Sequence, residues 1–358
     1  MGPYLRTNKV SFLKKSIFFL FGCLFTCNVF SQSLNLNSLT NNINENELKN
    51  LIYVYSSDFF KGRETGKIGQ KRAVKFISEY YESLNIKEAK GTENYFQKME
   101  LTISGNIVQT ENVVAVIEGS EKPNEYIIIS SHLDHEGEKN GVIYNGADDN
   151  GSGTIAVLKV AEAFQNAVLS GYRPKRSIIF LHLTGEEKGL LGSKFYTDNP
   201  LYPLENTMVN LNIDMIGRID PRHKNNVERY IYLIGTNLLS SELHEISEST
   251  NKNTTKLYLD YKYNDIDQLE CIYYRSDHFH FVKNNIPAIF YFNGVHEDYH
   301  KPTDTAEKIE YGLLKDRIKL IFFTAWELAN RNKSIEVDKN VDYSELVNCK
   351  RYIKLYNL

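Results

Sequence analysis

Short apolar runs alternate with stretches of helical character along most of the chain, and this alternation restricts the folds it can adopt. Apolar residues recur at three- and four-residue steps over 73–84, which predicts a helix there. Further helices are expected over 153–164, 240–250 and 306–330. Six runs of five or six residues have the apolar character of buried strands: 113–117, 126–130, 178–183, 209–214, 230–234 and 288–292. Strands that alternate with helices form a sheet covered on both faces, so we expect an α/β fold.

The first 31 residues have the pattern of a secretory signal peptide. Lysines precede the apolar stretch "SIFFLFGCLFTCNVF", and small residues precede a cleavage site before Gln32. The apolar stretch is short for a transmembrane helix, which needs about 20 residues. We therefore expect an exported chain, periplasmic or secreted, with no membrane span after cleavage. A lipid anchor at Cys23 or Cys27 is the alternative.

Composition is consistent with one globular domain. The 358 residues are 42% hydrophobic and 24% charged, and the net charge of −3 predicts no basic face for nucleic acid. We expect a lead-in over 32–54, mobile over 32–48, one domain over 55–335 and a C-terminal tail over 336–358. Cleavage would leave Cys271 and Cys349, which an exported protein could pair, although the sequence does not decide this. It indicates no oligomeric state either.

Histidine or acidic residues stand at the ends of four predicted strands. These residues are His132, Glu186, Glu187, Asp214 and His300. A fifth group, which contains Asp148, lies in "NGADDNGSG" just before the helix expected at 153. In open α/β sheets, ligands bind beyond the carboxyl ends of the strands. The sequence therefore predicts that these side chains share one edge of the sheet.

Each of these residues has an ordinary explanation when it is taken alone. Asp148 suits a turn, Glu186 and Glu187 suit a helix start, and His132 suits a sheet edge. Gathered together, the carboxylates would repel one another unless a cation neutralised them. Carboxylate and imidazole ligands suit zinc and, less selectively, cobalt or manganese. More than three such ligands are present, so a two-metal site with a bridging carboxylate is plausible.

The motifs together resemble those of the zinc-dependent exopeptidases of family M28, the aminopeptidase group. The matching stretches, in order along the chain, are "DFFKGRETG", "SHLDHEG", "YNGADDNGSG", "FLHLTGEEKGLLGS", "NLNIDMIG", "YRSDHFHF" and "HEDYHKPTDT". The resemblance covers about residues 55–330. It implies an M28-type peptidase domain over 55–335, with a mixed, mostly parallel central sheet sandwiched by helices.

The resemblance also implies a ligand set for two Zn²⁺ ions per chain. His132 and Asp214 would complete one site, and Glu187 and His300 the other. Asp148 would bridge the two ions. His300 is preferred to His296 because "DYHKPTDT" carries the match, and His135, His278 and His280 are expected to support the site without binding metal.

Three further roles follow from the same resemblance. Glu186 would act as general base, and Asp134 would hold the second ring nitrogen of His132. Tyr273 is a candidate donor to the oxyanion, or else a packed aromatic residue. Some relatives carry a second cysteine where this chain has Arg275, so the small disulfide that such relatives could form with the residue matching Cys271 is absent here.

The predicted function is a two-metal aminopeptidase acting on peptides with a free N-terminus. One alternative is a glutaminyl-peptide cyclotransferase of the same fold, which uses one zinc and departs from the full ligand set. Another exopeptidase activity, dipeptidase or carboxypeptidase, stays open because ligand spacing does not report which peptide end is held. A non-catalytic binding module is disfavoured, since such proteins would be expected to lose ligands or the base.

Overall fold

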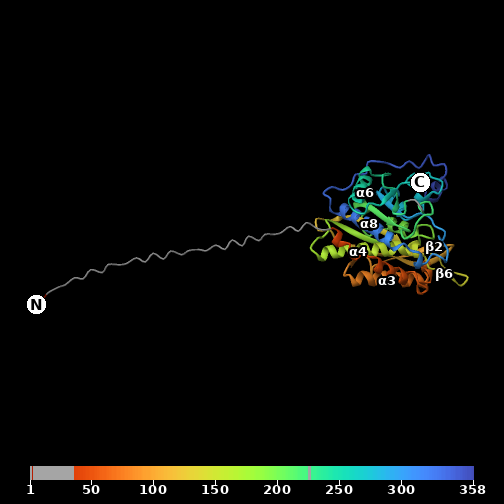
Figure 1. Ribbon diagram of the computed structural model, residues 1–358, viewed down its shortest axis with the longest axis horizontal. Coiled ribbons are helices and arrows are strands. Elements are labelled where there is room, and N and C mark those ends of the chain that lie inside the picture. Colours follow the sequence, from red (N-terminus) through yellow and green to blue (C-terminus); the bar gives the residue numbers. More distant parts are fainter. Residues whose placement is uncertain (1, 3–35, 225–226) are drawn as a thin grey trace. The chain divides into compact units, whose positions relative to one another are not determined.

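The computed structural model of the protein describes Gly2 and residues 36–224 and 227–358 (Figure 1). The predicted signal peptide over 1–31 and the alternative anchors Cys23 and Cys27 lie outside the described residues. Within the described part, no helix combines the length and the apolar character that crossing a membrane requires.

The described residues form one nine-stranded mixed sheet, in the order β1-β3-β7-β4-β8-β11-β9-β10, with β2 also paired to β3. The strands are β1 (Lys87–Glu88), β2 (Phe96–Ile103), β3 (Asn106–Ile117), β4 (Lys122–His132), β7 (Arg176–Leu183), β8 (Thr207–Ile213), β9 (Tyr230–Ile234), β10 (Tyr258–Asp260) and β11 (Ala288–Phe292). β5 (Gly137–Lys139) and β6 (Val142–Tyr144) form a separate hairpin. The central strands β7, β4, β8 and β11 are parallel, so their carboxyl ends meet at one edge.

Helices cover both faces of this sheet, as expected. They are α1 (Leu36–Leu39), α2 (Glu45–Tyr55), α3 (Ile68–Ser83), α4 (Gly153–Leu169), α5 (Leu191–Asp198), α6 (Ser241–Asn253), α7 (His278–Lys283), α8 (Tyr311–Asn330) and α9 (Arg351–Tyr356). Side chains alternate along β7 and divide between the two faces. Phe180 packs near Phe164 of α4, while Ile179 clusters with Tyr196 of α5 and Phe281 of α7. Figure 1 shows α8 beside α4, and the two helices are in contact.

The segments expected to be a lead-in and a tail pack onto the domain within the described residues. In α2, Leu48 and Ile52 are fully buried, so the described part of the expected lead-in contributes to the core. At the other end, Cys349 forms a disulfide with Cys271, and Tyr352 of α9 stacks against Tyr274. The C-terminal segment therefore covers one end of the hydrophobic core.

Candidate metal centre

Glu187 lies between two histidines just beyond the end of β7. Its Oε1 atom is 2.9 Å from His135 Nδ1, and its Oε2 atom is 3.1 Å from His300 Nε2. His135 follows β4, and His300 lies in the loop after β11 with a left-handed backbone (φ 54°). The side chain of Glu136 approaches His300 from the outer side, at 3.4 Å from Nδ1. This group gathers carboxylates and imidazoles from three separate strand ends.

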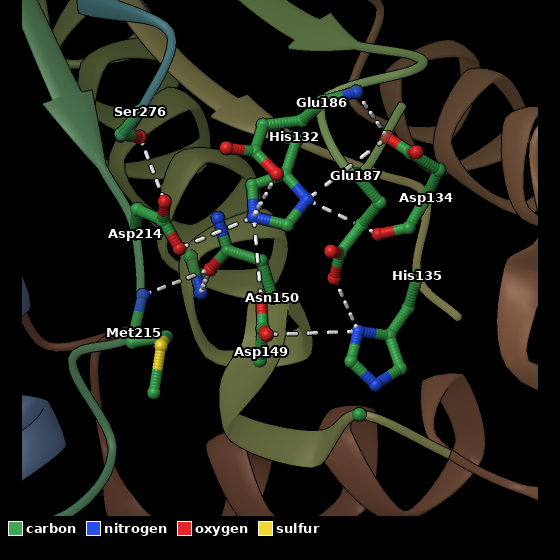
Figure 2. A network of polar contacts seen from close by, with 12 residues as sticks. His132, Asp134, His135, Asp149, Asn150, Glu186, Glu187, Asp214, Met215 and Ser276 are labelled. Carbon is green, nitrogen blue, oxygen red and sulfur yellow. Dashed lines mark hydrogen bonds and ion pairs between the residues drawn. The ribbon is translucent and has the colours of Figure 1, made fainter. Parts of the chain in front are cut away.

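A second group forms around His132, the last residue of β4. His132 Nε2 lies 3.1 Å from Asp214 Oδ1 and 4.0 Å from Glu186 Oε2. The other carboxylate oxygen of Asp214 accepts a hydrogen bond of 2.7 Å from Ser276 Oγ, which fixes the carboxylate (Figure 2). Ligand atoms of His132, Glu186 and Asp214 all lie within 4.8 Å of one another, which is close enough for one ion to contact them together.

Asp149 stands between the two groups, as Figure 2 shows. Its Oδ1 atom lies 3.4 Å from His132 Nε2, whereas its Oδ2 atom lies 3.1 Å from His300 Nε2 and 3.7 Å from His135 Nδ1. Although Oδ2 is buried, it forms no hydrogen bond of acceptable geometry with any described residue. A buried carboxylate needs positive charge close by, and the imidazoles around Asp149 supply it here, so this arrangement fits a carboxylate aimed at a cation.

We expected Asp148 to stand between the two groups, but the structure places Asp149 there instead. Asp148 Oδ1 accepts a hydrogen bond of 2.6 Å from Gly217 N, and its Oδ2 atom lies 3.0 Å from His296 Nε2. Both oxygens are therefore engaged away from the cluster. In the helical turn η2 (Ala147–Ser152), consecutive side chains point in different directions, and it is Asp149 whose carboxylate faces the histidines.

The turn that carries Asp149 is held from two sides. Asp304 accepts hydrogen bonds from the backbone N–H groups of Asp148 and Asp149 at 3.0–3.1 Å. On the other side, Asn150 Nδ2 donates to Ile213 O at 2.9 Å, and Asn150 Oδ1 accepts from Met215 N at 3.2 Å. The turn is thus tied both to the end of β8 and to the segment that supplies His300.

A proton on His300 offsets part of the negative charge in the first group. Burial opposes ionisation of Glu187, but hydrogen bonds from His135 and His300 outweigh it and lower the pKa of Glu187 to about 2. Burial likewise opposes the charge on His300, but Asp149 and Glu187 raise its pKa to about 10. The imidazolium here occupies the place that a cation would take. The donor set of carboxylates and imidazoles fits zinc, and loading an ion would release the proton on His300.

Glu186 and Asp134 interact through the backbone. Asp134 Oδ1 accepts a hydrogen bond of 3.2 Å from Glu186 N, and its Oδ2 atom accepts one of 2.8 Å from Thr65 Oγ1. His132 Nδ1 lies 3.1 Å from the Asp134 backbone oxygen and 4.0 Å from its carboxylate, so the main chain, and not the expected carboxylate, holds this ring. Burial raises the pKa of Glu186 well above its usual range, and Glu187 and Asp214 add to the rise.

Tyr273 lies away from the cluster, and the structure therefore favours the packed-aromatic alternative. It is fully buried, and its hydroxyl lies 3.3 Å from that of Tyr343. The cavity beside Glu186 is lined instead by Arg275 and Tyr299, which also carry polar groups. Sequence reasoning overlooked Tyr299, although its place directly before His300 was a usable signal.

The buried carboxylate–imidazole centre lies beyond the carboxyl ends of parallel strands, which is where open α/β folds bind their ligands. The chain belongs to peptidase family M28, whose family model matches residues 112–325. It is 28% identical over 228 residues to a probable leucine aminopeptidase of Arthroderma otae. That match covers 62% of this chain and 58% of the relative, so the chain spans less than two thirds of that relative's length.

Solved structures share the fold at low identity. BSAP, a zinc aminopeptidase from Bacillus subtilis, superimposes with a TM-score of 0.63 at 14% identity, over 82% of this chain and 98% of that chain. The glutaminyl cyclase of Porphyromonas gingivalis has a TM-score of 0.60 at 16% identity, over 78% of this chain and 97% of that chain. Both functions occur on this fold, so residues of the site have to discriminate between them.

Proposed function

We propose that the protein is a zinc-dependent aminopeptidase with two metal ions per chain. The observation that carries this proposal is Asp149, because each of its carboxylate oxygens faces a different group of histidines. His132 and Asp214 would complete one site, and Glu187 and His300 the other, with Asp149 shared between them. His135 lies close enough to Glu187 to compete with His300 for the second site.

Glu186 is proposed as the general base. Its carboxylate lies no closer than 4.0 Å to His132, and it lines the cavity beside the centre. Burial raises its pKa, so it would hold a proton firmly once it had accepted one. Bound divalent ions would supply a water of lowered pKa and a positive charge near the peptide carbonyl. Glu186 would take the proton of that water and pass it to the leaving amine. The hydroxyl of Tyr299, in the same cavity, would donate a hydrogen bond to the carbonyl oxygen.

A glutaminyl cyclotransferase is the second candidate, favoured by the fold alone. Such an enzyme needs one ion, whereas this chain offers two groups of ligands around a shared carboxylate. The presence of two groups of candidate metal ligands therefore favours the two-metal hydrolase. Peptides with free N-termini are the proposed substrates, and export from a signal peptide ending before Gln32 is proposed from the sequence pattern.

Metal content and hydrolysis, measured on the chain from Gln32 onward, test this function. We expect about two zinc ions per chain and hydrolysis of leucine p-nitroanilide that a chelator abolishes and added zinc restores. About one ion, with cyclisation of an N-terminal glutamine and no anilide hydrolysis, would favour the transferase. If the protein neither bound metal nor turned over either substrate, both candidate functions would be contradicted.

A further inference from the structure

The cavity beside the metal centre combines an apolar lining with one guanidinium. It is a small, partly open cavity with a volume of about 30 Å³, and it is lined by Glu186, Asp149 and Asp214. Its other walls include five apolar side chains, Met215, Ile272, Phe290, Phe292 and Val295. Arg275, in the turn between the short helical segment η4 (Ile272–Tyr274) and α7, adds the positive charge. A substrate placed with its scissile bond at the centre would have to contact this wall.

Arg275 has no carboxylate partner among residues 36–224 and 227–358 within 4.0 Å. Its one hydrogen bond in this part of the chain runs from Nη2 to Tyr299 Oη, at 3.1 Å. Two buried arginines elsewhere in the described chain have more or stronger polar partners. Arg317 donates three hydrogen bonds to backbone carbonyls, and Arg218 pairs with Asp298 at 2.9 Å. Arg275 is thus a half-buried cation with most of its donors unused and facing a cavity.

The turn that carries Arg275 is fixed relative to the centre. The next residue, Ser276, donates a hydrogen bond to Asp214, and Cys271 is tied to Cys349 by the disulfide. The hydroxyl of Tyr299 accepts the hydrogen bond from Arg275, and the ring of Tyr299 stacks on His300 with centroids 3.8 Å apart. The guanidinium therefore has little freedom to leave the cavity wall and is preorganised for a ligand.

A guanidinium presents its N–H donors as a planar fork that matches the two oxygens of a carboxylate. A half-buried cation without a carboxylate partner has lost part of its hydration, and an anionic partner would offset that cost. We infer that Arg275 binds a carboxylate of the substrate during the proposed peptidase reaction. Two parts of a peptide could supply it: the side chain of an N-terminal Glu or Asp, or the α-carboxylate of a short peptide such as a dipeptide. This inference rests on the proposed function and narrows its substrate class.

Four substrates distinguish a side-chain carboxylate from an α-carboxylate as the group that Arg275 binds. Glutamate p-nitroanilide carries only a side-chain carboxylate, and leucine p-nitroanilide carries none. Leucyl-leucine carries an α-carboxylate, and its amide does not. For the Arg275→Gln variant we expect kcat/KM to fall about 10- to 100-fold for one of the two carboxylate substrates, the range for a lost charge-assisted hydrogen bond, and at most about threefold for its neutral partner.

Arg222→Gln is the matched control. Arg222 is a half-exposed arginine paired with Asp220 and Glu270 outside the cavity, so its loss should leave all four rates unchanged. An equal fall for all four substrates with Arg275→Gln would overturn the inference, because it would mean that Arg275 acts only by holding Tyr299 against His300. Equal wild-type rates on charged and neutral partners would overturn it as well.

Ligand binding to the metal-free protein gives a readout that does not need turnover, and it leaves the substrate leucyl-leucine intact. Calorimetric titration should show L-glutamate or leucyl-leucine binding the wild-type protein at least about 10-fold more tightly than L-glutamine or leucyl-leucine amide, with the difference lost in Arg275→Gln. Absence of that difference would contradict the inference even in an active enzyme. If the metal-loaded protein hydrolysed none of the four substrates yet retained this binding difference, the proposed function would fail and the carboxylate site would stand.

Discussion

Replacing Asp149 by asparagine tests the assignment of the bridging carboxylate directly. The substitution keeps the shape of the side chain but exchanges one oxygen for an NH₂ group and removes the negative charge. Because Oδ1 and Oδ2 face different histidine groups, at 3.4 Å from His132 and 3.1 Å from His300, an amide can offer an oxygen to only one of them. We expect the Asp149→Asn variant to retain about one ion where the wild-type protein holds two.

The expected weakening follows from the lost charge. Two unit charges about 4 Å apart interact by about 4 kcal/mol at an effective dielectric constant near 20. The candidate ligand atoms in each group lie within 4.8 Å of one another, so an ion bound among them would be no farther from Asp149 than the separation of about 4 Å assumed here. At about 1.4 kcal/mol per tenfold, losing such an interaction lowers metal affinity by about 1,000-fold. Hydrolysis should fall by at least the same factor at zinc concentrations that no longer fill both sites.

Asp148→Asn is the matched control, since it changes the adjacent residue by the same atoms. Its carboxylate serves Gly217 and His296, so we expect both ions to remain and the free energy of unfolding to fall by about 1–3 kcal/mol. Metal content by mass spectrometry, zinc affinity by competition with a chromophoric chelator, and denaturant unfolding measure these effects. Two ions bound with wild-type affinity in Asp149→Asn, or two lost in Asp148→Asn, would refute the assignment.

Three further predictions concern single groups. Glu186→Gln should keep both ions and lose at least about 100-fold in kcat, the size of a general-base contribution, so rates near the wild-type value would exclude this residue as the base. Cys349→Ser opens the disulfide to Cys271, 78 residues away in the sequence, and should lower the free energy of unfolding by about 2–4 kcal/mol; identical denaturation curves with and without reductant would argue against it. Burial lowers the pKa of His182 to about 3, below the value near 6.5 expected when unfolded. The unfolded chain therefore takes up the proton first, and stability present above pH 6.5 is lost as the pH falls towards 3, by about 2 kcal/mol at pH 5. His182→Gln should make the free energy of unfolding less dependent on pH between 7 and 5, and an unchanged slope would contradict the burial argument.

The buried strands could be predicted because burial on both faces leaves a continuous apolar run. Every residue of β9 and β11 is buried, and both strands begin and end where the sequence pattern places them. β2 was missed for the opposite reason. Its sequence FQKMELTI exposes every second side chain towards solvent, so polar residues interrupt the run. The helix expected over 306–330 is divided, with a short turn at Ala306–Lys308 before α8 begins at Tyr311.

The location of the candidate site could also be predicted, but the aim of individual side chains could not. The sheet fixes the ends of its strands. Residues at or directly after those ends, such as His132 and Asp214, are therefore brought together by topology. Tyr273 and Asp149 lie in turns without a repeating period, where one residue along the chain can reverse the direction of a side chain. Tyr273 follows Cys271, whose left-handed backbone (φ 52°) starts the turn, and Ile272 lines the cavity while Tyr273 enters the core.

The two pairs of adjacent acidic residues now have one physical explanation. Two neighbouring carboxylates aimed at the same point would repel each other, and in both pairs the chain separates them. Glu186 turns towards His132 while Glu187 turns towards His300, so the two carboxyl groups enter different histidine groups. In the other pair, Asp149 faces the centre, whereas its neighbour Asp148 bonds to the backbone behind it. Asp304 binds the N–H groups of that second pair four residues after His300, so one segment supplies a candidate ligand and also fixes the carboxylate that faces it. Movement of this segment would therefore displace His300 and Asp149 together, so the geometry of the group around Glu187 depends on the loop after β11 as well as on the sheet.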